Sequence, residues 1–425
     1  MGGGAMKTEK IQRRYGSGTR WAKLRLLEFF IVAVLVWVPE MAGAGTSQEK
    51  ALFDTLYARC QDPFLPFPSK IFDLCTSVFT GGLAGGSFVP SGVTTNVGST
   101  GVQGTASQSA AAQQRKCTGS PTECREVENK KKGGGASADF SFGNVGFLVS
   151  LQTGEMARKP TDLENGFDAD FRGLTLGADY RFTDRFLVGL TLGYNDNDAT
   201  FRESAGGLRS KTSSGTLYLT YTPLDNAYIG AYAGTGRIRN TGNKRVVIGS
   251  PVILISGTVG SSNRGTQDIA GVSGGYDWQV GGARVGAFLN VDSARNRVDG
   301  YTESGSTGME LIHPTQTIRS LTSTLGLRFS TSRALDWGTM QPEFRIAQVH
   351  EFRNDARVIQ TALAIDPTTV FTVATDAPDR NYGLLGFGAN LETGRGTRWF
   401  VDYERRVGHA FLSTWAANVG VIVGF

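Results

Sequence analysis

The sequence predicts an all-β fold: a twelve-stranded antiparallel transmembrane β-barrel, preceded by a short N-terminal segment that is partly helical and partly disordered. Three observations predict it. Strand-length segments alternate between apolar and polar residues up to the end of the chain, their polar positions are rich in glycine and charge, and the connections between them alternate between short and long. A closed barrel accounts for all three, because only a closed sheet can face lipid without leaving backbone amides unpaired in hydrocarbon.

The last strand shows the alternation most clearly. Successive side chains of a β-strand point to opposite faces of a sheet. One face is predicted to carry Phe411, Trp415, Ala417, Val419, Val421, Val423 and Phe425, and the other Thr414, Asn418, Gly420 and Gly424. The apolar face is unbroken to the carboxyl terminus, so we expect it to hold the signal for barrel assembly. The candidate residues are Phe425, Val423, Val421, Val419 and Trp415.

The same alternation recurs upstream, for example in residues 172–182, 185–194, 283–292 and 397–406. A half-buried strand of a soluble protein also alternates. A soluble strand does not, however, place charge and glycine on its inward face in strand after strand. We therefore expect a polar lumen. The charged residues assigned to it are Asp179, Arg181, Arg284, Asp292, Glu343, Arg345, Glu351, Arg398, Asp402, Glu404 and Arg406.

Twelve strands are predicted from residue 139 onward. They span residues 140–153, 169–182, 185–198, 211–222, 226–239, 264–280, 283–297, 315–330, 339–353, 380–393, 397–407 and 410–425. Connections after the even strands are mostly short, and connections after the odd strands are long except at Gly408–His409. Bacterial barrels have short periplasmic turns and longer external loops. Both ends of the barrel are therefore expected in the periplasm, and the N-terminal segment enters from there.

The apolar run from Phe29 to Val38 is too short for a membrane-spanning helix, which needs about 20 residues. It follows Lys23 and Arg25 and precedes small residues, which predicts a signal peptide over residues 1–44. Most of the net charge of +5 lies in this leader, so the remaining chain is nearly neutral. No clustered basic face of the kind that binds nucleic acid is predicted.

Residues 45–138 are expected to form a short passenger or linker segment, and residues 139–425 the barrel. The segment contains two apolar stretches with helical spacing, near residues 51–64 and 69–79, and then a Gly/Ser/Thr-rich tract. Its two cysteine pairs, Cys60 with Cys75 and Cys117 with Cys124, are candidate disulfides after export, with their connectivity open. Their spacings do not match those of zinc ligands, and no metal or cofactor is expected.

Four separated stretches resemble the β-domain of the autotransporter (type V secretion) family. They are GLTLGADYRFTDRFLVGLTLGY, GYTESGSTGMELIHPTQTIRSLTSTLGLRFS, PEFRIAQVHEF and the terminal aromatic strand, and the resemblance covers about residues 139–425. The resemblance implies a Gram-negative outer-membrane barrel, a helix threaded through the lumen, export by the general secretory translocon and insertion by the barrel-assembly machinery through Phe425. Two features depart from the family: the passenger is short, and the paired asparagines of the self-cleaving branch are absent, since Asn129 stands alone before Lys130.

Catalytic motifs are weak in this chain. GVSGG around Ser273 matches a nucleophile elbow, but an elbow needs a strand-to-helix turn and this stretch lies in a predicted membrane strand. His313, His350 and His409 fall in an external loop, a strand and a hairpin, and no histidine lies in the passenger. A Ser-His hydrolase is therefore not expected there, and the protein is predicted not to be an enzyme.

Two functional hypotheses remain. The first is a translocator or anchor that lies among outer-membrane lipid and exports or retains its short N-terminal segment. The second is a barrel that acts for itself, as a channel, adhesin or structural protein, with a vestigial passenger. The segment is periplasmic under the second hypothesis, and under the first it can reach the cell surface. No partner of the passenger can be named from the sequence.

Overall fold

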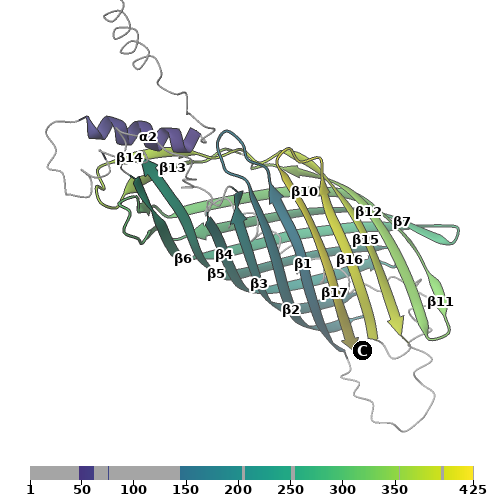
Figure 1. The fold of residues 1–425 in the computed structure, drawn as a ribbon. Coiled ribbons are helices and arrows are strands. Elements are labelled where there is room, and N and C mark those ends of the chain that lie inside the picture. The colour runs from purple at the N-terminus through teal and green to yellow at the C-terminus, as the bar shows by residue number, and fades with distance from the viewer. Residues whose placement is uncertain are drawn as a thin grey trace, which may run out of the picture. The chain divides into compact units, whose positions relative to one another are not determined.

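The computed structural model describes residues 47–61, 75, 144–202, 206–249, 254–353, 355–393 and 397–424, and its main body is a β-barrel (Figure 1). The predicted fold class is confirmed. The barrel strands are β1 (Val145–Arg158), β2 (Phe167–Thr183), β3 (Phe186–Phe201), β4 (Gly206–Leu224), β5 (Ala227–Gly249), β6 (Leu254–Val280), β7 (Ala283–Val298), β10 (Gln316–Thr331), β12 (Gly338–Glu351), β15 (Asn381–Thr393), β16 (Thr397–Val407) and β17 (Leu412–Gly424).

The first and last strands close the barrel. β1 runs antiparallel to β17, from Gly146 opposite Gly424 to Arg158 opposite Leu412. The other strands follow one another around the sheet, and β10 pairs with β12 to complete the ring. Because each of the twelve barrel strands has two neighbours, the described part of the barrel leaves no sheet edge to expose unpaired amides to lipid.

The two ends of the barrel differ in their connections. At the end where the C-terminus lies, β2 and β3, β4 and β5, and β6 and β7 are joined by tight turns (Figure 1). The turn after β6 contains Gly281 with a positive φ of 59°, a conformation that favours glycine. Between β10 and β12 at this end, β11 (Arg333–Leu335) extends the connection. This is the periplasmic end by the rule that bacterial barrels keep their short turns there.

Several strand boundaries differ from the sequence-based expectation. β1 begins and ends about five residues later than predicted. β5 and β6 continue through residues expected to form a loop, as a long hairpin paired from Gly249 opposite Leu254 down to Ala227 opposite Tyr276. Outside the bilayer a strand no longer needs an apolar outer face. The apolar–polar alternation that identifies a membrane strand in the sequence therefore ends there, while the backbone hydrogen bonds between the two strands continue.

The two longest external connections fold into a second sheet. It contains β8 (Tyr301–Thr302), β9 (Leu311–His313), β13 (Val358–Leu363) and β14 (Val370–Ala374), in the order β14-β13-β9-β8. Both connections are loops by the sequence-based expectation. An isolated bridge between Gly260 and Ser304 joins this sheet to the long β5–β6 hairpin. We call this four-stranded sheet, together with the outer part of that hairpin, the external cap.

One helix of the N-terminal segment is described, α2 (Ser47–Cys60), at the site of the first predicted helix. A disulfide joins Cys60 to Cys75, with the two Cα atoms 5.3 Å apart. Cys117, Cys124, the predicted leader and the Gly/Ser/Thr-rich tract lie outside the described residues. Among the residues that are described, no helix is long and apolar enough to cross a membrane.

Candidate functional site

The outer wall of the barrel carries a belt of exposed apolar side chains. Leu190 of β3, Leu289 of β7 and Leu325 of β10 are 49%, 48% and 62% exposed. Aromatic residues lie near the periplasmic end of this belt, where Tyr180 contacts Phe182 with their ring centroids 4.8 Å apart. An apolar band bordered by aromatic rings matches the lipid-facing wall of an outer-membrane barrel.

Inside the barrel lies a cavity with a volume of about 760 Å³. Arg345 of β12 carries the main ion-pair cluster in its wall. Its guanidinium lies 3.0 Å from Glu343 and 2.7 Å from Asp402, and Glu404 is 4.0 Å away. Three carboxylates around one guanidinium give the cavity wall a polar surface here.

Glycines provide the space for inward rings and charges. Tyr218 donates a hydrogen bond of 2.9 Å to Asp179, and its ring lies over Gly189 of the neighbouring strand, where an added Cβ would be 2.3 Å from Cζ. Arg328 similarly contacts Asp277 at 2.6 Å, next to Gly286. These inward-facing glycines thus leave room for larger side chains from neighbouring strands.

The charged residues assigned to the lumen from sequence occupy three kinds of position. Seven line the cavity: Asp292, Glu343, Arg345, Glu351, Asp402, Glu404 and Arg406. Asp179 is buried under Tyr218, and Arg398 lies 3.5 Å from Glu392. Arg181 and Arg284 are half-buried at the periplasmic ends of β2 and β7.

At the external mouth of the barrel, a buried ion cluster links three connections that are far apart in sequence. Arg158 at the end of β1 lies 2.7 Å from Glu164 and also pairs with Asp376 of the long β12–β15 connection. Its guanidinium lies 4.7 Å from the ring centroid of Phe411. Burial raises the pKa of Glu164, while the charge of Arg158 and its hydrogen bond act against that rise. No local spacing in the sequence relates the members of this cluster, so it could not be predicted.

A second buried cluster lies within the external cap, where its four-stranded sheet meets the outer part of the β5–β6 hairpin. Glu303 lies 2.5 Å from Lys244 and 3.1 Å from Nε2 of His313, and it accepts a hydrogen bond from the backbone of Leu311. Burial by itself raises the pKa of Glu303, but the attraction of Lys244 and the contact with His313 outweigh burial and lower it. Burial lowers the pKa of His313. The cluster fixes the cap sheet to the barrel wall.

The remaining sequence candidates do not form a catalytic group. Ser273 lies within β6, which continues as strand to Val280, so no strand-to-helix turn follows it. His350 of β12 contacts Asn381 at 2.8 Å, and His409 lies 3.4 Å from Asp379 at the external rim. Among the described residues, no group of three or more His, Cys, Asp or Glu side chains is arranged to hold a metal ion.

The candidate assembly residues share one face of β17. Val419 and Val423 are 51% and 47% exposed, and Val421 and Trp415 are half-buried on the same side. The indole of Trp415 donates a hydrogen bond of 3.0 Å to Glu155 of β1, across the closing seam. Phe425 lies outside the described residues.

The family model of the autotransporter beta-domain matches residues 149–404, more than half of the chain. The chain belongs to the autotransporter beta-domain family. The translocator domain of the autotransporter NalP from Neisseria meningitidis superposes with a TM-score of 0.51 at 16% sequence identity, covering 75% of this chain and 98% of that one. This likeness shows the fold.

Two curated relatives match in sequence. Both are named outer membrane protein A, from Rickettsia conorii and Rickettsia rickettsii, and each is 21% identical to this chain over 293 residues. The match covers 65% of this chain but only 14% and 13% of the relatives. Family and fold together identify this autotransporter barrel as an outer-membrane translocator of a Gram-negative bacterium.

Proposed function

We propose that this autotransporter barrel exports its own short N-terminal segment and keeps it attached at the cell surface, with α2 docked on the external cap. The observation that carries the proposal is the apolar core shared by α2 and the cap. A segment left in the periplasm would have no access to that core, because the cap lies at the end of the barrel opposite the tight turns.

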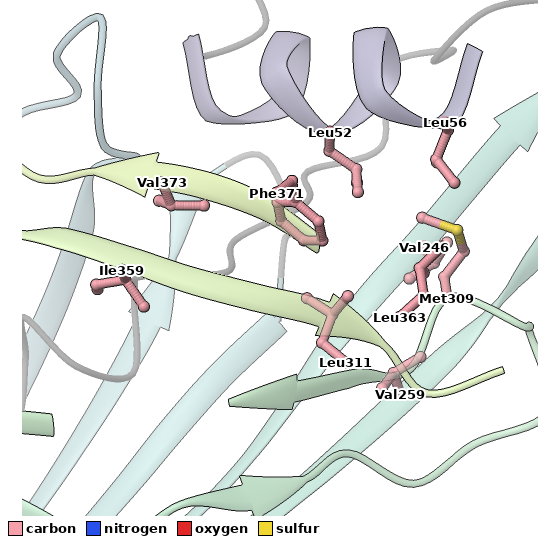
Figure 2. Close-up of a cluster of buried hydrophobic side chains, with 10 residues drawn as sticks. All are labelled: Leu52, Leu56, Val246, Val259, Met309, Leu311, Ile359, Leu363, Phe371 and Val373. Carbon is pink, nitrogen blue, oxygen red and sulfur yellow. The ribbon is translucent and has the colours of Figure 1, made fainter. Parts of the chain in front are cut away.

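The helix is held by buried apolar contacts. Leu52 and Leu56 of α2 are 0% and 2% exposed, and Figure 2 shows both side chains pointing toward the cap, where Phe371 and Met309 are also buried. The other members of this cluster are Val246, Val259, Leu311, Ile359, Leu363 and Val373. Burying a leucine contributes roughly 1.5–3 kcal/mol, so two leucines suffice to hold a short helix against a preformed surface.

A polar contact fixes the end of the helix. Arg59, in the last turn of α2, lies 2.9 Å from Asp366 and donates a second hydrogen bond of 2.9 Å to Thr368. A basic side chain in the last turn of a helix also interacts favourably with the helix dipole. The disulfide between Cys60 and Cys75 follows directly, so the chain leaves the docked helix through a covalently closed loop.

The connectivity of the chain indicates that the lumen is the path of the segment between α2 and β1. Under the proposal, α2 lies outside while β1 begins at the periplasmic end, so the chain between Cys75 and Val145 must pass through the barrel. The outer wall is apolar and excludes that path, whereas the cavity is polar and none of the described α2 residues lines it. The small side chains of the Gly/Ser/Thr-rich tract, residues 81–114, suit such a passage.

Thiol labelling of intact cells tests the proposal. Lys50→Cys, on the exposed side of α2, is placed in a chain whose four native cysteines are replaced by serine. Two matched positions calibrate the signal: Ser306→Cys in the external cap and Asp184→Cys in the tight turn between β2 and β3. An impermeant maleimide should label position 50 as fast as position 306. Labelling only after the outer membrane is permeabilised, as expected for position 184, would support the periplasmic-remnant hypothesis instead.

We also propose that the general secretory translocon and the barrel-assembly machinery handle this chain, with residues 1–44 as a cleaved leader. The face of β17 formed by Trp415, Val419, Val421 and Val423, extended by Phe425, is the proposed assembly signal. Deleting Phe425 should leave the protein in the periplasm, where it is degraded. Normal outer-membrane amounts and normal heat-modifiable migration of the deletion variant would argue against this role.

We propose no catalytic role for the barrel. The described histidines lie on separate structures: the cap, the outer wall and the rim. A hydrolase needs its nucleophile and its base within hydrogen-bonding distance. The lumen charges instead suit a polar passage.

A further inference from the structure

We propose that the outer wall of the barrel carries a binding site for the phosphate groups of a glycolipid headgroup in the outer leaflet, separate from the translocation lumen. The site consists of six basic residues on five neighbouring strands, β4, β5, β6, β7 and β10. They are Lys211, Arg237, Arg239, Arg264, Arg295 and Arg319, and we call them the basic patch. All six are exposed and point outward.

The height of the patch matches the border between hydrocarbon and headgroups. On β4, Lys211 is the first outward charge beyond the lipid-facing Tyr221, and on β10 Arg319 is the first beyond Phe329. Each lies about ten residues up its strand, which at the usual strand rise and tilt is roughly 25 Å, the height of the apolar band. The guanidinium and ammonium groups therefore begin where the phosphates of outer-leaflet lipids lie.

The strand register places like charges directly opposite one another. Arg239 faces Arg264 across β5 and β6, and Arg295 faces Arg319 across β7 and β10. Lys211 faces Arg239 from the other side. Like charges opposite each other destabilise a sheet. A polyanion lying across the strands would remove that repulsion, and arginine is well suited to phosphate because it donates two parallel hydrogen bonds.

The nearby acids are engaged elsewhere. Asp196, opposite Lys211 in the register, receives both hydrogen bonds from Arg209. Asp268, opposite Arg295, accepts a hydrogen bond from Thr235. Within the described part of the chain, none of the six patch side chains forms a hydrogen bond or an ion pair. Arg297 is left out of the patch because it lies 3.6 Å from Asp299.

The opposite side of the barrel supplies a matched control. Lys159, just after β1, and Arg172 and Arg405, in the outer halves of β2 and β16, are also exposed and basic. No basic residue faces Arg172 or Arg405 in the register. A patch variant (Arg239→Gln, Arg264→Gln, Arg319→Gln) and a control variant (Lys159→Gln, Arg172→Gln, Arg405→Gln) therefore lose the same charge at similar height. Folding of both is checked by heat-modifiable migration.

Binding of purified lipopolysaccharide to the full-length protein in zwitterionic detergent is the first measurement. The patch variant should bind at least tenfold more weakly than the wild type, the control variant within twofold, and dephosphorylated lipopolysaccharide at least tenfold more weakly than the native lipid. Inorganic phosphate at millimolar concentration should not compete. Equal binding by the patch variant, equal binding of the dephosphorylated lipid, or full competition by inorganic phosphate would overturn the proposal.

A single substitution gives a second measurement that does not depend on the triple variant folding. Arg264→Gln removes the repulsion with Arg239, so it should raise the apparent Tm of the barrel in zwitterionic detergent without lipid. In the presence of lipopolysaccharide the wild type should have the higher Tm, because lipid phosphate stabilises two facing arginines more than one. An Arg264→Gln protein that keeps the same Tm difference from wild type in both media would refute the site.

Discussion

At the scale of single residues, the barrel wall depends on pairs in which a glycine on one strand accommodates a large side chain from the next. Tyr218 lies over Gly189, and its hydroxyl reaches Asp179 on the strand beyond. The aromatic ring, the missing side chain and the carboxylate therefore form one unit across three strands. An inward glycine of this kind is a packing requirement, whereas an added Cβ at Gly215 or Gly274 would meet its neighbours only at ordinary van der Waals distance.

Gly189→Ala should destabilise the barrel by about 1–3 kcal/mol, the usual cost of overpacking. The new methyl group would lie 2.3 Å from the ring of Tyr218, so the ring must move and its hydrogen bond to Asp179 is lost. Gly274→Ala is the matched control, because its nearest neighbouring atom is 3.6 Å from the added carbon. Urea unfolding followed by heat-modifiable migration measures both. Equal destabilisation of the two variants would contradict the packing role of Gly189.

Asp366 should make the docking of α2 dependent on pH. Burial acts to raise its pKa, but hydrogen bonds from Thr368, Thr369 and Arg59 outweigh burial and lower the pKa to about 2. Thr368 and Thr369 belong to the same loop as Asp366, so only the share of the lowering that comes from Arg59 of α2 depends on docking. A carboxylate whose pKa is lower in the docked state stabilises that state at higher pH and loses the effect as the pH falls toward 2. Docking should therefore weaken between pH 4 and pH 2.

The measurement is the anisotropy of a fluorophore attached to Lys50→Cys in purified protein. Asp366→Asn should weaken docking at neutral pH and remove most of the change between pH 4 and pH 2. Asp54→Asn, on the exposed side of α2, should leave that change intact. An Asp366→Asn protein with the full pH response would show that other carboxylates cause it.

At the scale of strands and helices, the two faces of each barrel strand meet different media. Leu289 of β7 is 48% exposed on the lipid side, while the adjacent Asn290 lines the lumen cavity. Along one strand, positions that exclude charge thus alternate with positions that tolerate it. The faces can be tested by neighbouring substitutions on the same strand.

Leu289→Arg should cost about 2–4 kcal/mol, because it places a guanidinium in the lipid-facing band. Asn290→Arg should cost far less, since the side chain enters a polar cavity that already contains Asp292 and Glu343. Outer-membrane amounts and urea unfolding of the two variants give the comparison. Equal losses, or a greater loss for Asn290→Arg, would contradict the face assignment of β7.

The sequence predicted the membrane part of these elements well because lipid imposes a period of two on every strand. It fails where that constraint ends. The outer halves of β5 and β6 and the four cap strands carry no lipid-facing stripe, so they were expected to be loops. The ion clusters around Arg158 and Glu303 join residues that only the closed barrel brings together. Residues of the lumen wall could be assigned a face from periodicity, but their partners depend on the register.

At the scale of the whole molecule, the barrel and the docked helix differ in what holds them. Every barrel strand finds both neighbours within residues 145–424, so the ring is complete without the N-terminal segment. The external cap, in contrast, buries part of its apolar surface only under α2. The helix α2 therefore buries apolar side chains of the cap, and the cap is a docking surface formed by the external connections of the barrel.

Deleting residues 45–61, with residues 1–44 kept, should accordingly leave barrel assembly unchanged. The apolar side chains of the cap that α2 buries should become exposed. Phe371, Leu363 and Met309 would lose the leucines that cover them, and β13 and β14 would become dynamic, because a small sheet with one apolar face exposed is marginally stable. Limited proteolysis of intact cells should cut within residues 352–380 at least tenfold faster. Lys50→Ala, at an exposed position of the helix, should leave that rate unchanged. A deletion variant with normal protease resistance would mean that the cap is stable alone, and a deletion variant that fails to assemble would mean that the ring needs its N-terminal segment after all.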